Sequence, residues 1–333
     1  MSTSPLIRYS LSIGAAVLLA KCGGSQPPIG VPGAMPQTSA IAAHADRGKS
    51  WMLPAPTTAH SADYVASGPL LYVTNQNPVY NDVTVYHAGA KDPAPIATIS
   101  DDLNGPAGVC LDSQGTLYVT NQPNDGLGWV TEYPLGKTNP SKTITRGMNT
   151  PAYCAIDRSG NLWVTNIGGR NATEYLHGSK KPHTVITEDM VYPTGIAIDS
   201  SGNLYVSNRL SSGGDVVVFP PGSEDPSRTI TDGVTSPVAL AIDASGNLYV
   251  TNVTQNNIEE YAPGADQPFR TITQGVSTPA GLTVSEKGWL FAANLERDTV
   301  VEFRPGSARL SKRSISNGLH APIGLAIYPA VLP

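Results

Sequence analysis

Side chains suited to acid–base or metal chemistry are spread along this chain of 333 residues without converging on one place. Four aspartates, Asp112, Asp157, Asp199 and Asp243, recur about once per 43 residues. They therefore cannot form the close carboxylate pair that acid–base catalysis uses. No spacing typical of metal ligands occurs among the six histidines, which are His44, His60, His87, His177, His183 and His320. We assign no catalytic residue and expect no metal site and no cofactor.

The unusual residues in the middle of the chain fit a ligand-recognition site better than a catalytic or metal site. Two tyrosines lie there among charges of both signs, in segments that we expect to be loops. Such side chains, which a fold does not itself require, are typical of ligand-binding surfaces. The open alternative is neutral variation on solvated loops. The candidate ligand-binding residues are Arg146, Tyr153, Arg170, Glu188, Asp189, Tyr192, Arg209 and His320.

Composition limits the fold that must position these residues. The chain has 33 Gly and 29 Pro, both of which are unfavourable inside helices, so a mostly helical protein is excluded. Hydrophobic residues make up 40%, enough for a large core, whereas charged residues make up only 14%. A net charge of -5 argues against nucleic acid as a partner, because that would require a basic surface. We expect a β-rich, monomeric protein outside the cytoplasm.

The N-terminus has the pattern of an export signal. Arg8 precedes an apolar stretch from Ser10 to Ala20 that is too short to span a bilayer but matches the core of a signal peptide. The following Leu19-Ala20-Lys21-Cys22-Gly23-Gly24 resembles the lipobox of bacterial lipoproteins, in which the Cys is lipidated, although Lys21 replaces the usual small residue. The resemblance implies a lipid anchor on Cys22 in a bacterial cell envelope. The alternative is an ordinary signal peptide and a secreted protein.

Residues 23–67 are rich in Pro, Ala, Ser and Thr and show no periodicity. Such a composition buries too little apolar surface to order itself. We therefore expect three parts: a lipoprotein-type signal peptide at 1–22, a disordered tether at 23–67 and a folded domain at 68–333.

The folded domain consists of internal repeats. Six prolines that begin equivalent segments are separated by 45, 42, 44, 42 and 43 residues; they are Pro106, Pro151, Pro193, Pro237, Pro279 and Pro322. Each unit contains four short strand-like runs, which is the pattern of a β-propeller blade. The first unit lacks its first strand, and the C-terminal run Pro322–Ile327 is a first strand without a blade. We therefore predict an all-β, six-bladed propeller of four-stranded blades, closed by the C-terminal strand pairing into the N-terminal blade.

The repeats resemble those of NHL-repeat and YVTN-type propellers over residues 68–333. The motif Tyr-Val-Thr-Asn itself occurs at 72–75, 118–121 and 249–252. This resemblance implies a fold but not a function, since such propellers act as enzymes, binding modules and scaffolds. The Asn that closes the motif recurs in all six units, so we expect it to bind turn backbone rather than ligand.

Two classes of enzyme resemble propellers of this kind. Gluconolactonase-like six-bladed propellers hold a divalent cation near the axis through carboxylate and amide oxygens, but the first strands of these repeats offer no such side chain. Streptogramin lyases use His and Glu with magnesium on seven blades. We therefore expect a binding module for a protein, peptide or carbohydrate, attached to the membrane only through its lipid anchor. A hydrolase or lyase with a loop-built site is the alternative.

The two internal cysteines lie in the first strands of neighbouring units. Cys154 occupies a position with large apolar residues in the other units, and Cys110 one with small residues. The two side chains would therefore leave opposite faces of their strands, and a disulfide requires converging side chains. We expect two buried free thiols.

Overall fold

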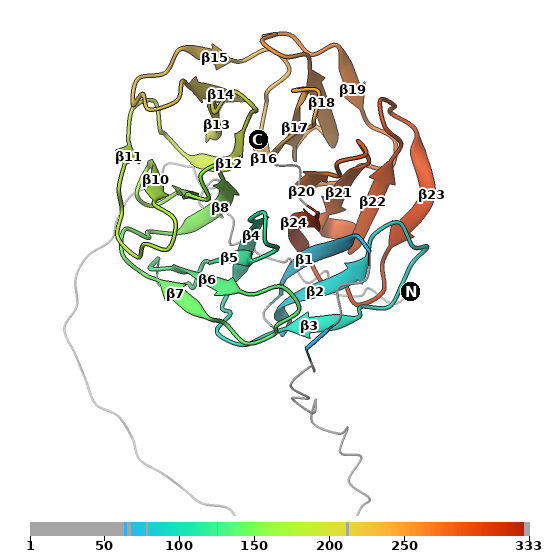
Figure 1. The fold of residues 1–333 in the computed structure, drawn as a ribbon. Helices are drawn as coiled ribbons and strands as arrows, with labels where there is room; N and C mark the ends of the chain where they lie inside the picture. The colour runs from blue at the N-terminus through green and yellow to red at the C-terminus, as the bar shows by residue number, and fades with distance from the viewer. Residues whose placement is uncertain (1–62, 65–67, 78, 125, 211–212, 330–333) are drawn as a thin grey trace, which may run out of the picture.

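The structure is a computed structural model that describes residues 63–64, 68–77, 79–124, 126–210 and 213–329. The predicted signal peptide, Cys22 and nearly all of the predicted tether lie outside the described residues. The described residues form six four-stranded antiparallel sheets arranged as blades of a ring, so the predicted six-bladed propeller is confirmed (Figure 1).

We letter the strands of each blade A to D from the axis outward and number the blades from the N-terminus. Blade 1 consists of β24 (Pro322–Tyr328), β1 (Leu70–Gln76), β2 (Asn81–His87) and β3 (Ala97–Ile99). Blade 2 consists of β4 (Pro106–Leu111), β5 (Leu117–Asn121), β6 (Trp129–Tyr133) and β7 (Lys142–Ile144). Blade 3 consists of β8 (Pro151–Ile156), β9 (Leu162–Asn166), β10 (Asn171–Tyr175) and β11 (Val185–Ile186).

The other three blades follow the same order. Blade 4 consists of β12 (Pro193–Ile198), β13 (Leu204–Leu210), β14 (Gly213–Phe219) and β15 (Arg228–Ile230). Blade 5 consists of β16 (Pro237–Ile242), β17 (Leu248–Asn252), β18 (Asn257–Tyr261) and β19 (Arg270–Ile272). Blade 6 consists of β20 (Pro279–Val284), β21 (Leu290–Asn294), β22 (Thr299–Phe303) and β23 (Leu310–Ile315), with a short 3-10 helix, Leu295–Arg297, between β21 and β22.

The ring is closed between its two ends, as predicted. The C-terminal strand β24 pairs antiparallel with β1, with Leu70 opposite Tyr328 and Leu71 opposite Ile327. This pairing removes the open inner edge that β1 would otherwise expose.

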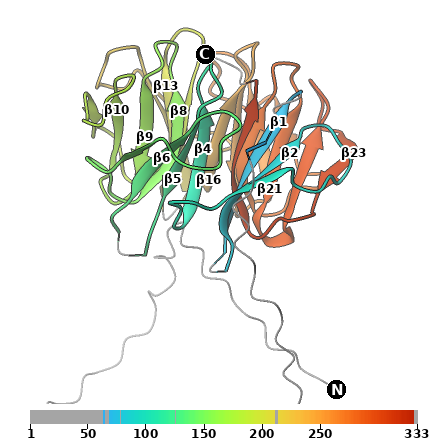
Figure 2. The ribbon, with the colours of Figure 1, turned by 60° about the horizontal axis from the view of Figure 1, so that its bottom comes forward.

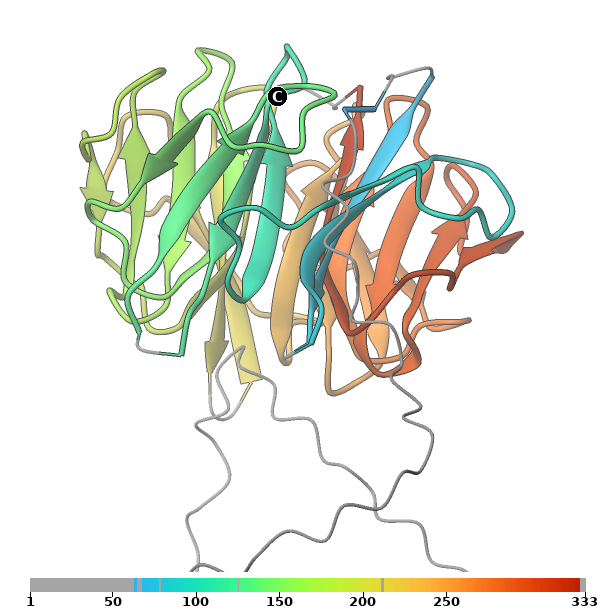
Figure 3. The same ribbon diagram turned by 90° about the horizontal axis from the view of Figure 1, so that it is seen from below.

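The strands run through the thickness of the disc, so their connections lie on two opposite faces (Figure 3). We call the face with the B–C and D–A connections the distal face, and the face with the A–B and C–D connections the proximal face. The two kinds of distal loop touch one another, because the amides of Thr150 and Thr278 donate to Gly126 and Asn256 in neighbouring B–C loops.

Each residue of the repeated Thr-Asn pair has a structural task. In blades 1 to 3 the Thr hydroxyl donates to the A strand of the next blade, as in Thr120 to the Ala152 carbonyl at 2.6 Å and Thr165 to the Thr194 carbonyl at 2.6 Å. The Asn side chain is buried, and its oxygen accepts a backbone amide of the preceding D–A loop, as in Asn121 from Asn104 at 2.9 Å. The predicted structural role of these Asn residues is confirmed in all six copies, which are Asn75, Asn121, Asn166, Asn208, Asn252 and Asn294.

The blades pack face to face through apolar side chains. The aromatic residue of each C strand is fully buried, and the hydroxyls of Tyr86, Tyr175 and Tyr261 donate to carbonyls of D–A loops at 2.6–2.8 Å. The A strands approach one another so closely at the axis that a Cβ on Gly281 would collide with the carbonyl oxygen of Ile323. Glycine occupies this position in four of the six blades, where the next A strand leaves no room for a Cβ; Tyr153 and Ala239 occupy it in blades 3 and 5.

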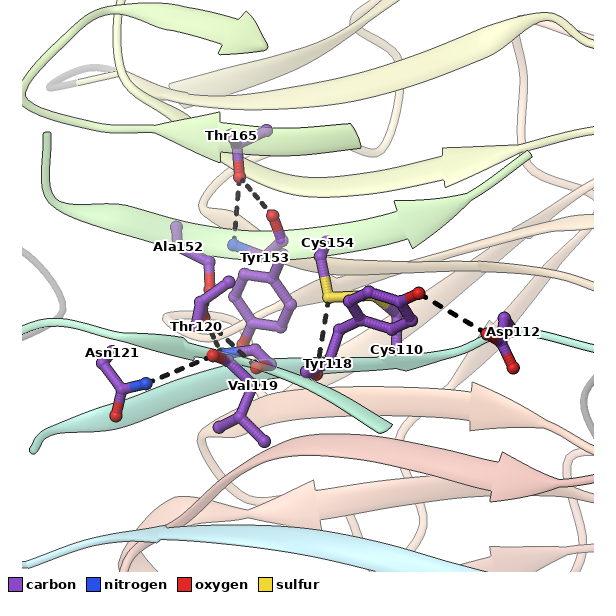
Figure 4. The surroundings of a disulfide bond; sticks show 11 residues. Cys110, Asp112, Tyr118, Val119, Thr120, Asn121, Ala152, Tyr153, Cys154 and Thr165 are labelled. Atoms are coloured by element: carbon purple, nitrogen blue, oxygen red, sulfur yellow. Dashed lines mark hydrogen bonds between the residues drawn. A yellow bond between two sulfur atoms is a disulfide. The ribbon is translucent and has the colours of Figure 1, made fainter. Parts of the chain in front are cut away.

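The prediction of free thiols at Cys110 and Cys154 is wrong, because the two form a disulfide with a Cα–Cα distance of 5.7 Å (Figure 4). Cys110 lies on β4 of blade 2 and Cys154 on β8 of blade 3. Neighbouring blades of a propeller pack through opposite faces of their sheets. Two side chains that leave opposite faces of equivalent strands therefore point toward each other, and both cysteines belong to one buried cluster between blades 2 and 3.

Candidate binding face

The predicted ligand-binding residues lie on the distal loops, except for Tyr153 and Arg209, which belong to strands β8 and β13. Arg146, Arg170, Glu188 and Asp189 are exposed. None of these four charged side chains forms an ion pair with another described residue. Because their charges are not neutralised within the fold, they are available to a partner.

Tyr192 and Arg209 are neighbours at the top of blade 4. The Arg209 amide donates to the Tyr192 carbonyl at 3.0 Å, and both side chains are half-buried. Burial raises the pKa of the Tyr192 hydroxyl, and the positive charge of Arg209 offsets part of this increase. Tyr192 therefore stays a neutral hydrogen-bonding group at ordinary pH. The structure thus gathers six of the eight predicted residues over blades 3 and 4: Arg146, Arg170, Glu188, Asp189, Tyr192 and Arg209.

Tyr153 does not join this exposed group. Its side chain is only 8% exposed, and its hydroxyl donates to the Ala280 carbonyl at 2.6 Å. Ala280 lies on β20 of blade 6, which is opposite blade 3 in the ring (Figure 1). The Tyr153 side chain therefore crosses the axis to reach it. Desolvation raises the pKa of its hydroxyl. Such a buried, hydrogen-bonded ring supports the packing of the inner strands, and a ligand on the distal loops would not reach it directly.

His320 lies apart from the other predicted residues, in the loop that enters blade 1. Its ring stacks on Tyr80, with centroids 3.9 Å apart and an interplanar angle of 13°. The carboxyl group of Asp82 lies nearby, and burial raises its pKa. The Asn75 side-chain amide, which donates to this carboxyl group at 2.7 Å, and the His320 ring both lower the pKa. The pair Tyr80–His320 therefore forms a flat aromatic surface over blade 1.

The exposed apolar side chains of the distal face were not predicted from the sequence. Val79 is 78% exposed and Tyr80 44% in blade 1, Leu127 is 68% exposed in blade 2, and Val191 is 52% exposed between blades 3 and 4. In the described distal loops of blades 5 and 6 no large apolar side chain is exposed. Apolar residues at loop positions were the available signal. Other apolar residues of the distal loops, such as Met148, Met190 and Val234, are buried, so sequence alone could not separate exposed from buried ones.

The central axis offers little chemistry. A cavity of about 150 Å³ is lined by the six A strands, including Tyr153 and both disulfide cysteines. Its lining contains no Asp, Glu, His or Asn side chain, so it does not fit the hard divalent cation that lactonase-type propellers hold. No group of three or more His, Cys, Asp or Glu residues within the described ranges is arranged to hold a metal ion. Among the described residues, no helix has the length and hydropathy to cross a membrane.

Comparisons with known proteins agree with the fold. No protein-family model matches the chain, and no curated protein matches it. A chain of the nidogen/laminin complex superimposes with a TM-score of 0.65 at 16% identity, covering 78% of this chain and 98% of that one. A protein from Bacteroides uniformis, provisionally assigned as a 6-phosphogluconolactonase, superimposes with a TM-score of 0.55 at 15% identity, covering 76% and 83%. Streptogramin B lyase gives a TM-score of 0.49 at 13% identity, covering 75% and 74%. At these identities the likeness concerns the propeller fold alone.

Proposed function

We propose that this protein is an NHL/YVTN-type propeller of the bacterial cell envelope, exported by its signal peptide and anchored through a lipid on Cys22, that binds a protein or peptide partner on its distal face. The observation that carries the proposal is the asymmetry of this face. Exposed apolar side chains lie over blades 1 to 4, together with charges that have no ion-pair partner among the described residues. Exposed apolar groups beside charged groups are the usual composition of a protein-binding surface.

The position of the N-terminal segment supports this orientation. Asp63 and Tyr64 contact the propeller on its proximal face, where the Tyr64 amide donates to the Gly136 carbonyl at 3.0 Å and Lys137 lies 2.6 Å from Asp63. Residues Gly68 and Pro69 then lead into β1 from the same face. A tether from Cys22 would therefore join the domain on its proximal face, opposite the proposed binding face.

Site-specific photo-crosslinking tests the binding face. p-Benzoylphenylalanine at position 127 or 191 should crosslink to one and the same partner in intact cells. The matched controls are positions 176 and 269, because Leu176 and Phe269 are exposed to 42% and 52% but lie at or beside C–D loops of the proximal face. Equal crosslinking from both faces, or none from 127 and 191, would contradict the proposal.

The lipid anchor is tested separately. Because one acyl chain binds a membrane only marginally and two or more bind it firmly, Cys22→Ser should move the protein from the membrane to the soluble fraction. Mass spectrometry of the mature N-terminus checks the acyl group directly. A wild-type protein that is already soluble and unacylated would refute the anchor but not the binding face.

A further inference from the structure

The A–B hairpin of blade 6 departs from a network that other blades share. In blade 5, Asn247 donates to the Asp243 carboxylate at 2.9 Å and the Tyr249 hydroxyl donates to it at 3.2 Å. Blade 4 repeats this arrangement with Asp199, Asn203 and Tyr205. In blade 6 the three equivalent positions hold Ser285, Trp289 and Phe291, so the polar network is replaced by two aromatic rings.

The neighbouring blade 1 is irregular at the same place. Its A and B strands come from opposite ends of the chain, so Pro69 and Tyr328 occupy the place of an A–B hairpin. These two irregularities face each other across the closure of the ring, where Figure 2 shows β1 beside β21. Between them lies a cavity of about 530 Å³, which we call the seam cavity. Its wall on the blade 6 side includes Trp289 and Phe291, and its wall on the blade 1 side includes Pro69, Ala88 and Ile327.

The four charged residues that line the seam cavity, Glu286, Lys287, Glu302 and Arg313, carry no net charge together. A guanidinium nitrogen of Arg313 lies 3.7 Å from one carboxylate oxygen of Glu302, and the guanidinium carbon lies 5.5 Å from the centroid of the Trp289 ring. The Ser311 hydroxyl donates to the other Glu302 oxygen at 2.8 Å. In blade 5 the equivalent pair, Arg270 and Glu260, is closer at 2.9 Å. The Arg313 guanidinium thus lies close to both Glu302 and the Trp289 ring, and the wall presents aromatic surface without an excess charge. The indole N–H of Trp289 donates to no described residue.

We propose that the seam cavity binds an uncharged, mainly apolar small molecule built on one or two aromatic rings. Its volume lies in the range of small-molecule sites, and an apolar wall with a few polar groups is their usual lining. A planar ring would pack against Trp289 and Phe291, and an acceptor on the ligand would take the indole N–H. This site is on the proximal side of the ring and is independent of the proposed function of the distal face.

The uncharged dye N-phenyl-1-naphthylamine is the probe, because its fluorescence rises in apolar surroundings. Titrated into the full chain, it should bind at a single saturable site with a dissociation constant below about 100 μM, the affinity expected of a ligand of this size. Absence of saturable binding would overturn the proposal.

A variant that restores the repeat provides the decisive comparison. Ser285→Asp, Trp289→Asn and Phe291→Tyr together give blade 6 the hairpin residues of blades 4 and 5, so the variant is expected to fold, as its melting curve checks. Its dissociation constant for the dye should rise at least tenfold. Ala88→Phe, which fills the cavity from blade 1, should have the same effect by a separate route.

Two control variants locate the site. Trp163→Tyr changes an aromatic residue of blade 3 to the residue found at this position in four other blades, and it should leave binding unchanged. Leu127→Asp, on the distal face, should also leave it unchanged. If the dye binds the repeat-restoring variant and wild type equally, or if Leu127→Asp abolishes binding, the dye occupies another surface and the proposal is wrong.

Discussion

Removal of the Cys110–Cys154 disulfide should destabilise the propeller by about 4 kcal/mol. The bond joins residues 44 apart in the sequence, and the chain-entropy model gives roughly this value for a loop of that length. The bond links the innermost strands of blades 2 and 3 within a buried cluster, so the native state keeps both strands in place when it is absent. The loss should therefore come mainly from the larger freedom of the unfolded chain.

The assay is urea unfolding followed by circular dichroism, with and without reductant. With a slope of about 3 kcal/mol per molar urea, reduced wild type should unfold at a midpoint lower by about 1.3 M than oxidised wild type. Cys110→Ala with Cys154→Val supplies the control, because Ala and large apolar residues occupy these positions in other blades. This variant should resemble reduced wild type and should not respond to reductant.

Two results would refute the reasoning. Alkylation of the denatured, unreduced protein at Cys110 and Cys154 would show that the bond is absent. Equal midpoints for oxidised and reduced wild type would show that the bond exists but does not restrict the unfolded chain.

Three further predictions concern stability. A chain ending at His320 lacks β24 and leaves β1 with an open inner edge, so it should lose the cooperative wild-type melting transition; unchanged melting would contradict closure by β24. Tyr153→Phe should cost about 1 kcal/mol through the lost bond to Ala280, and Tyr153→Gly about 3–5 kcal/mol through the cavity left behind; a loss below 1 kcal/mol for the glycine variant would show that the ring is not packed as described. Burial raises the pKa of the Asp82 carboxyl group, whereas the amides of Ser316 and Asn317 lower that of Asp92. Ionised Asp82 therefore opposes folding increasingly as pH rises above its ordinary pKa, and ionised Asp92 favours folding until pH falls through its lowered pKa. At pH 7 Asp82→Asn should stabilise the protein and Asp92→Asn should destabilise it. Both effects should fade toward pH 3 in unfolding measurements. If both substitutions change the stability in the same direction, the opposite roles given to the two carboxylates are wrong.

The fold was predictable because each blade repeats the same pattern of strands and hydrogen bonds. Positions such as Thr120 and Asn121 make the same bonds in successive blades, so the repeat length, the strand order and the closure by Pro322–Ile327 were all visible in the sequence. The disulfide was not visible in the sequence, because predicting it requires knowing that neighbouring blades pack through opposite faces of their sheets. Strand alternation within one blade carries no information about the next blade.

The site was predictable only in part, for a related reason. Tyr153 was recognised as an exception to the Gly or Ala of its position, but sequence could not show that its hydroxyl reaches Ala280 across the axis. The charges near blades 3 and 4 were found because they break the pattern of the bland loops. Leu127 and Val191 were not found, because an apolar loop residue is buried or exposed according to the path of its backbone.

The repeat also indicates where function can be sought. A residue that all six blades share serves the ring, since a specific partner needs a site that occurs once. Residues that depart from the repeat, and whose role the structure explains, lie in three separate regions. These are the axis at Tyr153 and the disulfide, the distal loops of blades 1 to 4, and the seam cavity around Trp289. The first is buried and bonded within the fold, so it acts on stability. The other two are open to solvent on opposite sides of the disc, and distant sites of this kind contribute independently to binding and stability. A variant that weakens crosslinking at Leu127 should therefore leave dye binding at Trp289 unchanged, and the reverse should hold as well.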